Sequence, residues 1–240
     1  TDYSYAPDTI TPQENVAAQG SWGGVDRASA RVTAEWSVSD ATLVTAKLTL
    51  GQDKSELAIP DVTADNWAEY ASSAAFFLDP QDPALIDFAN ALDNDPFTVY
   101  SNMLPKLDSE QVGANLQIDH EFSGDTTATV LIGYESLDRD YTTSDNLPFA
   151  VADYLFNNDF SQFTVEARLA GQYSNNASWL VGAFSLQDKI DFGTNLLFLN
   201  SGLWQTDVQT DYIQERDSLG IFASSDWTPV DWFTLEAGLR

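Results

Sequence analysis

The sequence predicts an all-β fold, an antiparallel up-and-down sheet of about eight strands arranged as four hairpins. Three observations predict it: segments alternate apolar and polar residues with period two, short turn-forming segments join them in pairs, and long acidic segments separate the pairs. Tight turns at one end of the strands and long loops at the other are typical of a transmembrane β-barrel, of which these strands would form a part.

The first two hairpins are expected at about 28–53 and 110–139. In ARVTAEWS, residues 30–37, small or large apolar residues alternate with Arg, Thr and Glu, and the turn SVSDA leads to LVTAKLTLG. In VGANLQIDHEF, residues 112–122, apolar residues alternate with Asn, Gln, Asp and Glu, and SGDT leads to TATVLIGYE. Each strand therefore has one apolar face and one polar, charged face.

The other two hairpins are expected at about 161–190 and 214–240. VEARLA, residues 165–170, alternates in the same way, and the turn SNNA separates it from SWLVGAFSL. In DSLGIFASSDWTPVDWFTLEAGLR, TPVD separates the last two strands. Asn, Asp and Pro stand where tight turns need them.

The connections between hairpins differ from these turns. Residues 1–27, 54–109, 140–160 and 191–213 are expected to be extracellular loops, because they are long, acidic and contain scattered Pro and aromatic residues. Within the longest one, DPQDPALIDFANAL, residues 79–92, predicts a short helix. Leu85, Phe88, Ala89 and Leu92 would share one face of it after a proline start.

Aromatic residues gather beside the short turns. We expect a girdle at one membrane interface, where amphipathic rings settle at the level of the lipid headgroups. Its members are Trp36, Phe122, Tyr173, Trp179, Trp227 and Trp232. A second rim is expected from Tyr134, Tyr141, Phe160, Phe163, Phe192 and Tyr212, near the strand ends that lead into long loops.

Charge and composition exclude several classes of protein. With 37 acidic and 10 basic residues the formal net charge is -27, which repels nucleic acid. The chain has no cysteine, so disulfides, thiolate zinc sites and cysteine nucleophiles are excluded. No apolar run is long enough, at about 18 residues, to predict a transmembrane helix.

No pattern of catalytic residues is present. His120 is the only histidine, and the alternation places it on the apolar face near a turn, where an interfacial role is expected. Nucleotide-binding glycine motifs and a nucleophile-elbow serine are missing from the sequence. We expect a chain that is not an enzyme, with no catalytic residue, no cofactor and no metal site. The acidic loop tips at 93–96, 144–146 and 157–159 are expected to be solvated, with divalent-cation contacts as the alternative.

The residues expected to carry function lie on the polar strand faces and in the long loops. On the alternation, nine side chains would point into a lumen: Arg31, Glu35, Lys47, Asn115, Gln117, Asp119, Glu166, Arg168 and Glu236. Four loop aromatics are candidates for contact with a ligand, with packing inside the loops as the alternative: Trp67, Tyr70, Tyr100 and Trp204.

Three segments carry a resemblance to a known family. FSQFTVEARLAG, NNASWLVGAFSLQDKIDF and YIQERDSLGIFASSDWTPVDWFTLEAGLR resemble the barrel of TonB-dependent outer-membrane receptors, and the resemblance extends from about Asp108 to Arg240. It implies that the chain is part of one β-barrel domain of 22 strands, closed around a plug that this chain does not contain.

The resemblance also implies a function. A receptor of this family, in the bacterial outer membrane, captures a scarce solute such as a ferric siderophore, a corrinoid or an oligosaccharide. Import uses energy from an inner-membrane TonB-type complex, acting through the plug. Its partners would be outer-membrane lipid and lipopolysaccharide, the energy-transducing complex and the solute, and no nucleic acid. Two alternatives stay open: a complete eight-stranded outer-membrane barrel with a structural or adhesive role, and a soluble carbohydrate-binding β-sandwich.

Overall fold

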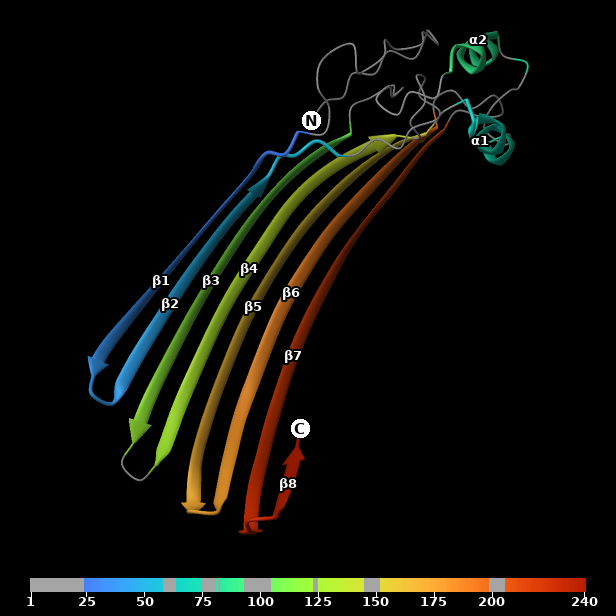
Figure 1. Cartoon of the computed structure of the whole chain (residues 1–240). Helices are drawn as coiled ribbons and strands as arrows, with labels where there is room; N and C mark the ends of the chain where they lie inside the picture. Colours follow the sequence, from blue (N-terminus) through green and yellow to red (C-terminus); the bar gives the residue numbers. More distant parts are fainter. Residues whose placement is uncertain are drawn as a thin grey trace.

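The computed structural model describes residues 24–57, 64–74, 81, 83–92, 105–122, 125–144, 152–198 and 206–240. It contains eight strands and two short helices (Figure 1). The strands are β1 Arg27–Ser39, β2 Thr42–Asp53, β3 Lys106–Phe122, β4 Thr126–Ser144, β5 Asp153–Ser174, β6 Ala177–Phe198, β7 Thr206–Val230 and β8 Phe233–Leu239. The helices are α1 Trp67–Ala74 and α2 Pro83–Ala91.

All eight strands belong to one antiparallel sheet in the order β1 to β8, so every strand pairs with its neighbours in sequence. This confirms the predicted all-β, up-and-down architecture. Within the described residues β1 does not pair with β8, so these strands do not form a closed eight-stranded barrel. They also form one layer rather than two, which contradicts the β-sandwich alternative, because a sandwich needs a second sheet on the apolar face.

The register of the strands defines two faces, since directly paired residues project to the same side of a sheet. We call outer the face that carries Val32, Leu48, Ala114 and Tyr134, which are paired in one row across β1 to β4. The opposite side is called the inner face. The register irregularities lie beside three of the turns, at 37/39, 172/174 and 227/230, so the alternation is unbroken through the body of every strand.

The short turns lie together at one end of the sheet, as expected (Figure 1). In the second one Asp125 has φ 57°, a left-handed conformation that Asp tolerates better than most residues. The last turn differs from the prediction. β7 continues through Thr228, Pro229 and Val230, and the turn is formed by Asp231 and Trp232. The irregularity between Trp227 and Val230 accommodates Pro229, which has no N–H for the ladder.

Strands β3 to β7 extend farther than the expected hairpins. β4 runs to Ser144 and β5 begins at Asp153, so most of the segment expected to be a loop over 140–160 is paired strand. In the same way β6 runs to Phe198 and β7 begins at Thr206. The added segments carry acids on the outer face and aromatic rings on the inner face. The added segments therefore do not have apolar residues on the outer face in alternation, although the backbone hydrogen bonds between the strands continue.

The helices lie beyond the strand ends opposite the short turns (Figure 1). Helix α2 begins at Pro83 and buries Leu85, Phe88 and, just after its end, Leu92, which confirms the predicted helix and its apolar face. Trp67 of α1 packs edge-on against Phe88, with ring centroids 5.5 Å apart. Neither of the described helices is long and apolar enough to span a membrane.

Gly182 on β6 is a point of close approach inside the sheet. It is paired with Arg168 and Phe222, and a Cβ built there would collide with the Phe222 ring and lie 2.9 Å from the carbonyl oxygen of Ala167. We therefore expect Gly182→Ala to lower the free energy of unfolding by about 1–3 kcal/mol, the usual cost of overpacking. Urea unfolding of the full-length protein measures it, and an unchanged midpoint would contradict the close contact.

Candidate functional site

Large hydrophobic side chains are exposed on the outer face. Val32 on β1 is 63% exposed, Leu48 on β2 is 43% exposed and Ile221 on β7 is 73% exposed. Other members of the same face are Leu50, Val112, Phe163, Leu169, Val181, Leu219, Leu235 and Leu239. An exposed apolar surface of this extent marks an interaction with another apolar phase.

The exposed hydrophobic residues form a band whose height matches a bilayer. On β5 the outer face is apolar or aromatic from Phe163 to Tyr173, a separation of about 33 Å along the strand at roughly 3.3 Å per residue. With the tilt of 35–45° that is usual for barrel strands, this becomes about 25 Å, the height of the apolar band of outer-membrane barrels.

Aromatic residues border the band on the side of the short turns. Trp36, Phe122, Trp179 and Trp227 share the outer face by register, and alternation places Tyr173 with them. Trp232 lies in the last turn and is 85% exposed. His120 is on the outer face too, where Phe122 packs edge-on at 4.5 Å and Nδ1 is 2.8 Å from the Thr42 hydroxyl. The six rings therefore lie beside the short turns, and that they form a girdle at a membrane interface stays a prediction.

The second aromatic rim differs from the expected one. Only Tyr134 and Phe163, which are paired directly opposite each other, lie on the outer face. The others, Tyr141, Phe160, Phe192 and Tyr212, project from the inner face. The outer face therefore carries fewer aromatic residues at this rim than predicted, because proximity to a strand end does not determine which side of the sheet a ring faces.

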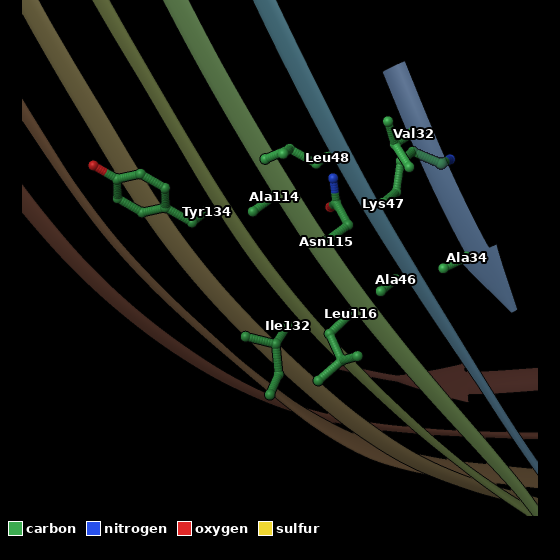
Figure 2. Close-up of a pocket in the computed structure, with 10 residues that line it drawn as sticks. All are labelled: Val32, Ala34, Ala46, Lys47, Leu48, Ala114, Asn115, Leu116, Ile132 and Tyr134. Atoms are coloured by element: carbon green, nitrogen blue, oxygen red, sulfur yellow. The ribbon is translucent and has the colours of Figure 1, made fainter. Parts of the chain in front are cut away.

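A shallow groove of about 330 Å³ lies in the band across β1 to β4 (Figure 2). Ala34, Ala46 and Ala114 line it between larger residues, among them Leu48, Leu116 and Tyr134. Its other lining residues are Val32 and Ile132 of the outer face, together with Lys47 and Asn115, which belong to the inner face by register. The alanine side chains are smaller than their neighbours, so they leave a depression on the apolar outer face. It is part of the surface that would contact lipid rather than of the polar face.

Above the band the outer face becomes acidic. Glu110, Asp138, Asp159 and Asp191 are directly paired in one row across β3 to β6, and Asp108 and Asp140 are paired in the next row. Burial raises the pKa of Asp138, and the surrounding carboxylates, Asp159 foremost, raise it further. Like charges directly opposite each other destabilise a sheet.

We expect Asp138→Asn to stabilise the full-length protein at neutral pH. A carboxyl whose pKa is raised in the folded state destabilises that state while ionised, and the cost disappears as the pH falls through the folded pKa. The gain should be about 0.2–1 kcal/mol at pH 7 and vanish towards about pH 4. Thermal unfolding at both pH values measures it. Asp217→Asn, whose partner is Gln187, should leave the midpoint unchanged. A gain from Asp138→Asn that persists at the lower pH would contradict the electrostatic cause.

The inner face brings together all nine residues expected to line a lumen. The register places Arg31 opposite Thr49, Lys47 opposite Asn115 and Arg168 opposite Thr129, and the same parity holds through β8. The remaining members are Glu35, Gln117, Asp119, Glu166 and Glu236. That this face lines a water-filled lumen stays a prediction.

Several of these side chains contact one another. Asp119 accepts hydrogen bonds from the Gln117 amide and the Thr129 hydroxyl, both at 2.7 Å, and Arg168 lies 3.6 Å from Glu166. Higher on the same face Gln111 donates to Glu135 at 2.7 Å. These contacts make the inner face over β3 to β5 mostly polar, with Leu131, Leu137 and Phe160 interspersed.

An ion pair on the inner face was not predicted. Asp188 on β6 lies directly opposite Arg216 on β7, and the guanidinium donates to Asp188 Oδ2 through Nε, at 2.8 Å, and through Nη2. The Asp188 side chain is only 4% exposed. No sequence pattern indicates this pair, because it depends on the register between two strands and its residues are 28 positions apart.

Four rings form a continuous ladder on the inner face above the level of the band. We call Tyr141, Phe156, Phe192 and Tyr212 the aromatic shelf. Tyr141 and Phe156 are stacked at 4.6 Å and 12°, Phe156 and Phe192 are 6.4 Å apart, and Phe192 and Tyr212 are 5.2 Å apart. Tyr212, at the end of the ladder, is 47% exposed. Phe156 was missed because the segment around it was expected to be a loop.

The loop candidates are placed only in part. Trp67 packs on Phe88, which favours packing within the loop, and Tyr70 belongs to α1. Tyr100 and Trp204 lie outside the described residues. In the part of the chain that the structure describes, no group of three or more His, Cys, Asp or Glu side chains is placed to hold a metal ion.

No protein-family model matches the sequence, and no curated protein matches it. The chain is similar to several solved structures. The ferric yersiniabactin uptake receptor FyuA from Yersinia pestis is 8% identical, with 85% of this chain and 26% of that chain covered and a TM-score of 0.48. The RagAB peptide transporter is 12% identical, with 84% and 26% covered and a TM-score of 0.45. The RagAB peptide importer in its "closed-closed" state is 12% identical, with 88% and 27% covered and a TM-score of 0.50.

These similarities concern the fold. At such low identity the last structure supports the wall of a larger β-barrel as the architecture of this chain, and nothing finer. The chain spans about a quarter of the length of each structure that it matches. Its own geometry adds a lipid-compatible outer band, a polar inner wall and an aromatic shelf above them.

Proposed function

We propose that this chain is part of the barrel wall of a bacterial outer-membrane receptor that captures a scarce solute and imports it. The observation that carries the proposal is the outer band of exposed hydrophobic residues, about 25 Å high and bordered by aromatic side chains. It meets lipid on one side of the sheet, while the inner face, with its charged and amide side chains, meets water, a plug or the passing solute.

The import step belongs to the same proposal. Resemblance to TonB-dependent receptors favours a plug in the lumen, energy from an inner-membrane TonB-type complex, and a barrel of 22 strands. Two of the structural neighbours are described as an uptake receptor and a peptide importer. In this scheme the chain makes and breaks no bond. Its inner face would guide the solute past the plug, and its upper wall and loops would capture it.

Fractionation of the full-length protein from its natural source tests the proposal. We expect it in the outer membrane, extractable only with detergent, with a denatured mass several times the 26.4 kDa of this chain. Uptake of the solute by energised cells should stop when an uncoupler collapses the proton gradient. Recovery of the full-length protein as a soluble species would contradict the membrane assignment, whereas uptake that resists the uncoupler would contradict only the energy source.

A further inference from the structure

The aromatic shelf is accompanied by an unsatisfied hydrogen-bond acceptor. Asn158 on β5 lies directly opposite Phe192, which in turn lies opposite Tyr212. The Oδ1 atom of Asn158 is buried and has no hydrogen-bond donor among the residues that the structure describes. Because a buried acceptor without a donor costs free energy, this atom favours a ligand that brings an O–H or N–H group to the shelf.

Hydroxyls and amides lie beside the shelf, among apolar neighbours such as Leu107 and Ile190. Thr194 and Thr210 continue the row of Tyr141 and Phe156, and Gln214 lies in the row below Tyr212. A few polar groups placed around aromatic surface are typical of sites for uncharged organic ligands.

Charge separates the two sides of the upper wall. Asp138, Asp140, Asp159 and Asp191 alternate with the shelf residues along the same strands but project from the outer face. On the inner face the charges near the shelf are Arg139, next to Asn158, and the Asp188–Arg216 ion pair. In the described part of the wall the surroundings of the shelf therefore carry little net charge.

This distribution discriminates between classes of solute. An anionic ferric chelate needs several Arg or Lys side chains at its site, and the described wall around the shelf offers only Arg139 and the ion-paired Arg216. A neutral oligosaccharide does not need such cations. The C–H faces of its rings pack on aromatic side chains, and its hydroxyls donate to acceptors such as Asn158 Oδ1.

We propose that the aromatic shelf is a binding subsite for a neutral oligosaccharide, with Tyr212 as the stacking surface and Asn158 as the acceptor. The inference rests on the proposed receptor function and narrows its substrate class. It places the first contact with the solute on the inner wall above the membrane, on residues contributed by β4 to β7.

Calorimetric titration of the full-length receptor in detergent tests it, with maltohexaose, cellohexaose and xylohexaose as neutral probes and a ferric tricatecholate as the anionic comparator. We expect at least one neutral probe to bind. Tyr212→Ala and Asn158→Ala should each raise its Kd roughly tenfold. Phe163→Ala removes a ring of the same kind from the outer face of β5 and should leave the Kd unchanged.

Three results would overturn the inference: no binding of the neutral probes, binding that neither variant weakens, or binding of the ferric chelate alone. In each case the receptor function can still stand, because it is judged by outer-membrane fractionation and energised uptake. A folded barrel migrates differently in gels before and after heating, so this assay recognises a variant that fails to fold. If one of the two variants fails to fold, the Kd of the other variant tests the inference.

Discussion

Ile132→Arg is expected to destabilise the protein folded in a bilayer by about 2–4 kcal/mol, the cost of Arg on the lipid face near the midplane. Ile132 lies on the outer face of β4 between Leu116 on β3 and Val165 on β5, two apolar neighbours that offer a cation no partner. The guanidinium would have to be buried in lipid or reach the interface by distorting the wall.

The matched control is the adjacent residue. Leu131 is also a large aliphatic residue on β4, but it projects from the inner face between Gln117 and Glu166. Leu131→Arg places the same charge beside a carboxylate and in contact with water, so we expect a change below about 1 kcal/mol. Urea titration of the full-length protein in phosphatidylcholine vesicles measures both variants.

The comparison of the two variants decides which face meets lipid. Equal losses would contradict the separation of an apolar outer face from a wet inner face. A larger loss for Leu131→Arg would reverse the assignment and place the polar network against the membrane. Only a larger loss of stability for Ile132→Arg than for Leu131→Arg agrees with the wall of a barrel.

The sequence predicted the sheet where one face of each strand is apolar and the other is polar. VEARLA on β5 and VGANLQID on β3 are polar on one side and apolar on the other, so their faces and their inner residues, such as Asn115 and Glu166, follow from period two alone. Above the band the rule changes. Asp159 projects outward and Phe160 inward, so the pattern no longer predicts a strand although the ladder continues.

Contacts across strands could not be predicted in this way. The Asp188–Arg216 pair requires that two strands align in one register, and the aromatic shelf requires it of four strands. A shift of one residue would place the partners on opposite faces. Strand β6 carries Leu180, Phe184 and Ile190 on the inner face, so it has little alternation of its own. Its position follows from pairing with β5 and β7.

The second large effect is expected at Arg216. Arg216→Met removes the partner that the structure gives to the Asp188 carboxylate, whose side chain is 4% exposed and is flanked on its own strand by Leu186 and Ile190. An uncompensated buried carboxylate costs about 3–5 kcal/mol. We expect a loss of about 3 kcal/mol in the unfolding free energy of the full-length protein, at the lower end of this range, because water approaches the pair from Arg216, whose side chain is 59% exposed.

The reverse substitution should be much milder. In Asp188→Asn the guanidinium of Arg216, a side chain that is already 59% exposed, turns to solvent, and we expect a loss of about 1 kcal/mol. Adding Arg216→Met to Asp188→Asn should then cost little more, since no buried charge is left unpaired. Urea unfolding of the four proteins completes the double-mutant cycle. Equal losses from the two single substitutions would show that burial of the carboxylate does not dominate, and additive losses would show that the two side chains are not coupled across β6 and β7.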